Sequence, residues 1–165
     1  MKQSLSFLQK LFRKFPLTSI CLALISLAIP GSLFAALGEN EASVQNDQVR
    51  MQANRRSIHS GNYNVHELRA PTGIVVREYV SSAGTVFGVA WEGPWPPDLQ
   101  QILGSYFQQY QKAMQEQQGD RPGRRPIQVE TSGLVVHLAG HPRSFAGHAY
   151  VPNMLPQGTS AGEIR

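Results

Sequence analysis

The sequence predicts an α+β fold: a single antiparallel sheet with one long amphipathic helix packed on one face. Two observations carry this prediction. Segments rich in β-branched and aromatic residues occur in two runs of about three, and one apolar stripe with helical spacing lies between the runs. The connections within each run are short and contain Gly or Pro, which favours antiparallel neighbours over parallel crossovers.

The predicted strands of the first run cover residues 63–70, 73–81 and 85–92, and those of the second run cover 127–131, 133–140 and 143–151. Simple alternation in the third strand places Phe87, Val89 and Trp91 on one face. The other face carries Gly88 and Ala90, which are small enough to lie under a closely packed segment.

The predicted helix starts after Asp98 and extends for about twenty residues, or roughly 30 Å at 1.5 Å per residue. Asp98 can cap its first turn, with Gln101 as the reciprocal partner three residues later. Gly104 lies inside the helix, where it is either tolerated or lets the helix approach a strand closely. The apolar stripe consists of Leu99, Ile102, Leu103, Tyr106, Phe107, Tyr110 and Met114, opposite a face made mainly of glutamine.

Residues 1–35 have the pattern of an export signal. Four basic residues precede the apolar segment 20–29, and Pro30-Gly31 and small residues follow it. The apolar segment is short for a bilayer core of about 30 Å. We therefore expect cleavage near Ala35 or Ala36, a periplasmic or secreted protein, and membrane contact only through the signal peptide during export. An uncleaved anchor that extends to Leu37 is the alternative.

The remaining chain predicts a polar lead-in segment at 36–61 with a short helix around 47–56, an α+β domain at 62–158, and a C-terminal tail at 159–165. Removal of residues 1–35 leaves 11 basic and 11 acidic residues, so the basic excess belongs to the leader. A neutral domain argues against a nucleic-acid partner. The single cysteine, Cys21, lies in the leader, so no disulfide is expected in the exported part.

Three histidines form the candidate metal site. His137, His141 and His148 lie within twelve residues, and they could bind zinc or copper if the last two strands form a hairpin. The competing interpretation is that they are structural or surface side chains, since carboxylate neighbours are scarce. The sequence predicts no bound cofactor.

The stretch "VFGVAWEGPWPPDL", residues 86–99, forms the corner between sheet and helix. The favoured interpretation is that Trp91 and Trp95 both seal this corner. The alternative leaves Trp95 half exposed to stack on a ligand, and Tyr150 is a third candidate ligand contact. "GTSAG" at 158–162 matches a hydrolase motif by chance, because no histidine follows Ser160.

The order of these landmarks resembles a known family. The segments "GIVVREYVSSAGTVFGVAWEGPWPPDLQQILGSYFQQY" (73–110) and "SGLVVHLAGHPRSFAGHAYVPNMLPQG" (132–158) follow an exported leader. This pattern is similar to a bacterial family of small exported proteins catalogued only as a domain of unknown function. The resemblance implies a Gram-negative envelope and assigns no chemistry.

Two function classes follow. The favoured class is a non-enzymatic envelope protein that binds an envelope partner or a small ligand through the exposed sheet or the Trp95 corner. The rival is a hydrolase, or a metal-dependent enzyme or metal-binding protein, centred on His137, His141 and His148.

Overall fold

The computed structural model describes residues 37–117 and 126–165. They belong to one compact unit, Leu33–Arg165. The predicted signal peptide at 1–35 lies outside the described residues. Among the helices in the described ranges, none is long and apolar enough to cross a membrane.

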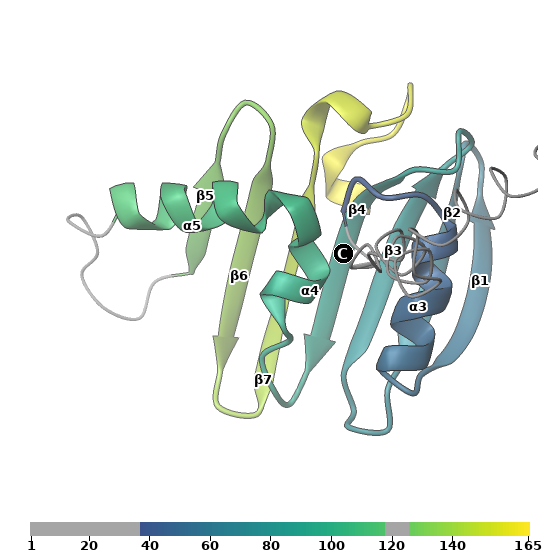
Figure 1. Cartoon of the computed structure of the whole chain (residues 1–165), viewed down its shortest axis with the longest axis horizontal. Helices are drawn as coiled ribbons and strands as arrows, with labels where there is room; N and C mark the ends of the chain where they lie inside the picture. Colours follow the sequence, from purple (N-terminus) through teal and green to yellow (C-terminus); the bar gives the residue numbers. More distant parts are fainter. Residues whose placement is uncertain (1–36, 118–125) are drawn as a thin grey trace, which may run out of the picture. The chain divides into compact units, whose positions relative to one another are not determined.

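One antiparallel sheet of seven strands organises this unit, in the order β1-β2-β3-β4-β7-β6-β5 (Figure 1). Every neighbouring pair in that order is antiparallel. The strands are β1 (Asn54–Ser60), β2 (Tyr63–Arg69), β3 (Val75–Ser81), β4 (Val86–Gly93), β5 (Ile127–Glu130), β6 (Val135–His141) and β7 (Ser144–Tyr150).

The sheet is assembled from two halves, and in each half a helical segment precedes an antiparallel meander. Helix α3 (Ala42–Arg50) precedes the meander β1–β4, and a second helical segment precedes the meander β5–β7. The last strands of the two meanders pair with each other, from Gly88 opposite Tyr150 to Gly93 opposite Phe145. The predicted α+β class and the single antiparallel sheet are therefore confirmed, although the first run has four strands.

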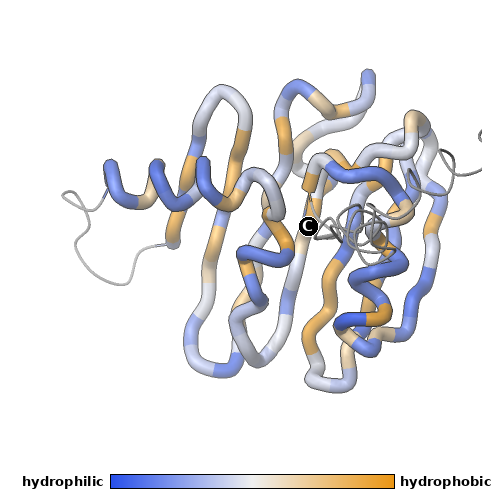
Figure 2. The backbone as a smooth tube through the Cα atoms, viewed as in Figure 1, coloured by the Kyte–Doolittle hydropathy of each residue, from blue (hydrophilic) through white to orange (hydrophobic). Residues whose placement is uncertain are grey.

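The N-terminal boundary differs from the prediction. Residues 36–61 were expected to form a polar lead-in with a helix around 47–56, but the structure places α3 at Ala42–Arg50 and β1 at Asn54–Ser60. The strand β1 lies at the sheet edge and most of its side chains are exposed. Hydrophilic residues make up most of it (Figure 2). An edge strand of this kind lacks the apolar alternation that reveals strands in a sequence.

The expected single helix is bent. It consists of α4 (Leu99–Leu103), a 3-10 turn η2 (Gly104–Tyr106) and α5 (Phe107–Glu116). Gly104 has φ +50° and ψ −121°, which only glycine adopts readily, and the chain changes direction there (Figure 1). The prediction of one long helical segment is therefore confirmed, although the segment is bent at Gly104. The predicted cap is also confirmed: Asp98 accepts hydrogen bonds from the backbone N–H groups of Gln100 and Gln101.

Two apolar clusters cover the two faces of the sheet. Trp91 and Val89 pack with the helices, and Phe87 packs on the opposite face with Ile164 from the C-terminal segment. The expected shared face for Phe87, Val89 and Trp91 is wrong, because the β3–β4 register shifts between Tyr79 and Val80. A β-bulge of this kind reverses the alternation on one side of it.

The 159–165 segment, expected to be a separate tail, closes the second cluster. Ile164 is 1% exposed. A Cβ atom at Gly88 would lie 2.8 Å from its Cδ1. This close approach agrees with the expectation that Gly88 lies under a packed segment.

We expect Ile164→Ala to lower the free energy of unfolding by about 2 to 4 kcal/mol, because it leaves a cavity over Gly88. Denaturant unfolding measures the change, and Met154→Ala, at an exposed position, serves as the control. A loss within the error of that control would show that the C-terminal segment does not seal this face.

Candidate functional site

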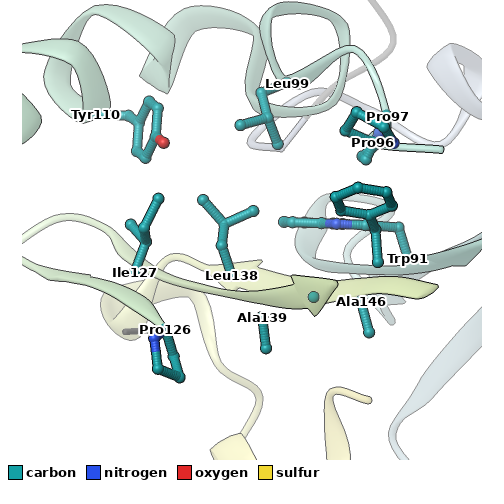
Figure 3. A pocket seen from close by; sticks show the side chains of 12 residues that line it. Trp91, Pro96, Pro97, Leu99, Tyr110, Pro126, Ile127, Leu138, Ala139 and Ala146 are labelled. Carbon is teal, nitrogen blue, oxygen red and sulfur yellow. The ribbon is translucent and has the colours of Figure 1, made fainter. Parts of the chain in front are cut away.

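An apolar groove of about 350 Å³ opens between the bent helical segment and the β5–β6–β7 part of the sheet. We call it the Trp91 groove. Figure 3 shows Leu99, Pro97 and Tyr110 on one side of it. Trp91 and Leu138, with Ile127, face them from the sheet. The remaining lining residues are Pro96, Pro126, Ala139, Gly140, Phe145 and Ala146.

Two glycines, Gly147 and Gly104, determine the shape of this groove. Trp91 lies opposite Gly147 on β7. A Cβ atom at Gly147 would come within 2.5 Å of Cζ2 of the indole ring. Glycine therefore lets the ring lie flat over β7 as the floor of the groove. The bend at Gly104 then directs α5 away from the line of α4, so that Leu99 and Tyr110 both face the groove.

The two tryptophans of the corner have different environments. Trp91 is 3% exposed, whereas Trp95 is 60% exposed. The expectation that both rings seal the corner is therefore wrong for Trp95. Trp95 immediately precedes Pro96 and Pro97 in the sequence, and these two prolines line the Trp91 groove.

Tyr150 lies apart from these residues. It belongs to the apolar cluster on the opposite face of the sheet. Its ring stacks on His148, with centroids 6.4 Å apart and an interplanar angle of 20°. The structure therefore does not bring Tyr150 to the Trp91 groove.

The histidine cluster separates into a pair and an outlier. His137 and His148 are cross-strand partners with ring centroids 4.8 Å apart, whereas His141 pairs with Ser144 at the far end of the hairpin. Across residues 37–117 and 126–165, no group of three or more His, Cys, Asp or Glu side chains is placed to hold a metal ion. Glu130 Oε1 lies 3.6 Å from His137 Nε2.

Protonation of His148 should lower the stability of the fold at acidic pH. Burial, and then the neighbouring His137, lowers the pKa of His148 below its ordinary value of 6.5. A lowered histidine pKa gives stability that is present above 6.5 and is lost as pH falls through the folded-state value. We expect His148→Gln to flatten the acid side of the melting-temperature profile, and His141→Gln, an exposed control, to leave it unchanged. Equal acid sensitivity in all three proteins would contradict this account.

Comparison with known proteins gives one assignment. Residues 33–164 match the family described as "Protein of unknown function (DUF2844)". The chain belongs to this family. No curated protein and no solved structure matches it. The resemblance to a family of unknown function is thus confirmed, while its bacterial and exported character stays a prediction.

This DUF2844 chain also buries a pair of carboxyl groups. Glu78 on β3 is 2% exposed and Asp47 on α3 is 4% exposed. Burial, followed by the charge of Asp47, raises the pKa of Glu78 well above its ordinary value. Burial also raises the pKa of Asp47, although the Gln101 amide opposes the shift. One proton shared by the two carboxyl groups accounts for their burial.

The pair connects three elements. Gln101 on α4 donates from Nε2 to Asp47 Oδ1 at 2.5 Å, so its side chain faces α3 rather than returning to the helix cap as expected. The sequence contained a signal for Glu78, which alternates with Val76 and Val80 and therefore shares their inward face.

We expect Glu78→Gln to stabilise the protein at neutral and alkaline pH. A raised carboxyl pKa gives stability that is present below 4.5 and is lost as pH rises through the folded-state value, whereas a glutamine amide donates to Asp47 at any pH. Melting temperatures across pH measure this, with the exposed Glu92→Gln as control. A parallel pH dependence in wild type and Glu78→Gln would refute the shared proton.

Proposed function

We propose that this chain is an exported binding protein that takes a small apolar ligand in the Trp91 groove. The observation that supports this most directly is the pair of facing apolar walls, with Leu99 and Tyr110 opposite Trp91, Ile127 and Leu138 (Figure 3). A volume of about 350 Å³ lies in the range of small-molecule sites, which are mainly apolar with few polar groups.

The residues that line the groove favour ligand binding over catalysis there. Among the described residues that line it, the Tyr110 hydroxyl is the single titratable side-chain group. A lone hydroxyl can orient a ligand but offers no nucleophile with a base. Trp95 adds an exposed aromatic ring next to Pro96, where it can extend the contact beyond the groove.

Export is part of the proposal, with the periplasm of a Gram-negative cell as the expected location. The family match begins at residue 33, after the basic and apolar part of the leader. Leu37 is fully buried and its N–H donates to Ile102 O at 3.2 Å. Cleavage after Ala35 or Ala36 would therefore leave the first described core residue in place.

We expect the protein recovered after expression of the full chain to begin at Ala36 or Leu37. Intact mass and N-terminal sequencing of the purified protein measure this. Recovery of the uncleaved chain in the membrane fraction would support the anchor alternative instead.

Binding can be followed through a single tryptophan. The chain has two tryptophans, so Trp95→Phe leaves Trp91 as the only indole. We expect the apolar dye anilinonaphthalenesulfonate to bind this variant with energy transfer from Trp91 to the dye. Leu138→Gln in the same background should weaken binding about tenfold, because it places an amide in the groove.

Ser144→Gln is the control, since Ser144 is an exposed residue of β7 that does not line the Trp91 groove. Unchanged dye affinity in Leu138→Gln, or equal losses in both variants, would exclude the Trp91 groove as the binding site. A protein segment that displaces the dye would identify a partner instead of a small molecule.

A further inference from the structure

A hydrogen-bonded chain of Ser, His and Glu side chains lies in the other half of the molecule. Ser57 on the edge strand β1 is the cross-strand partner of His66 on β2. Its Oγ lies 2.8 Å from His66 Nδ1. The other ring nitrogen, Nε2, lies 2.9 Å from Glu41 Oε1.

The partners fix the direction of these hydrogen bonds. An ionised carboxylate only accepts, so Nε2 of His66 carries the proton that is donated to Glu41. The lone pair of Nδ1 then accepts hydrogen bonds from the Ser57 hydroxyl and from Arg55 Nη2. A general base that activates a serine requires this protonation state.

The three side chains differ in exposure as such a unit requires. His66 is 3% exposed, whereas Ser57 is exposed on the edge strand. Glu41 is fixed at the start of α3, where its backbone N–H donates to Gly84 O at 2.8 Å. The base is thus buried, while the Ser57 hydroxyl is open to molecules from solution.

Arg55 supplies positive charge beside Ser57. It lies two residues earlier on the same face of β1. Its Nη2 is 3.0 Å from His66 Nδ1, 3.3 Å from His66 Nε2 and 3.8 Å from Glu41 Oε1. Since Ser57 Oγ and Arg55 Nη2 both contact His66 Nδ1, a negative oxygen that forms at a group bound to Ser57 would lie near the guanidinium. Burial, and then Arg55, lowers the pKa of His66, which keeps the ring neutral and able to accept a proton at neutral pH.

We propose that Ser57, His66 and Glu41 form a nucleophile, base and orienting carboxylate that hydrolyse small carboxylic esters. This activity goes beyond ligand binding and does not depend on the Trp91 groove. Ser57 on β1 and Ile127 on β5 lie on the two edge strands of the sheet.

The steps balance without a cofactor. Ser57 Oγ bonds to the ester carbonyl carbon while its proton moves to His66 Nδ1, and Arg55 faces the carbonyl oxygen as it becomes negative. The bond to the alcohol oxygen breaks, and that oxygen takes the proton from His66. Water then attacks the acyl-serine with His66 again as base, which releases the acid and restores Ser57.

A fluorophosphonate probe tests the nucleophile. Its P–F bond breaks as Ser57 Oγ bonds to phosphorus, fluoride leaves, and His66 takes the proton. We expect intact mass of the full chain after expression and purification to show one adduct, mapped to Ser57 by peptide analysis. Ser57→Ala should abolish it, while Ser132→Ala, at another exposed serine, should retain it.

Hydrolysis of p-nitrophenyl acetate tests the unit as a whole. We expect Ser57→Ala to reduce the rate above background about a hundredfold. Glu41→Gln tests a positioning residue: it should keep the circular dichroism spectrum and the fluorophosphonate site, lower the rate, and change its pH profile. Failure of the probe to modify Ser57, or a Ser57→Ala rate equal to wild type, would overturn the proposal and leave His66 a buried ring with satisfied nitrogens.

Discussion

The pairing of β4 with β7 is the constraint on which the rest of the structure depends. It joins two meanders that each follow a helix, and each of its residue pairs combines a small residue with a larger one, as in Ala90 opposite His148 and Val89 opposite Ala149. Gly147 in this pair permits the close approach of the Trp91 ring. A larger side chain there would displace the ring and with it the floor of the Trp91 groove. The β4–β7 pair at the centre of the sheet and the candidate binding site therefore depend on the same packing contacts.

The two halves use the helix-covered face in opposite ways. The first half buries polar groups under and beside α3: Asp47, Glu78 and His66 are all nearly inaccessible and have polar neighbours. The second half places apolar side chains under α4 and α5 and leaves part of that face open as a groove. Buried polar groups need specific partners. This requirement explains why the first half is closely connected to its helix while the second tolerates an open space.

The spacing of apolar residues and the positions of turn residues were sufficient to predict six of the seven strands and the start of the helical segment at Asp98. They were insufficient where contacts with other strands or helices determine the local structure. The strand β1 has no apolar alternation because it is an edge, and the faces of Phe87 and Val89 depend on a register shift in β3–β4 pairing. The bend at Gly104 was not predicted, because the spacing of apolar residues continues through the glycine and does not show its backbone conformation.

The same limit applies to the candidate sites. Trp91 and Trp95 stood out as aromatic residues near a corner, but only the folded structure shows that Trp91 is the floor of a groove and Trp95 is exposed. His66 drew no attention because Ser57 is nine residues away and Glu41 is 25 residues away in sequence. Both candidate sites form where a helix begins against the sheet: Glu41 precedes α3, and Pro97 precedes α4. A helix start brings a short, constrained segment over the strands, so in each half the residues at that start complete a site whose other members come from the strands.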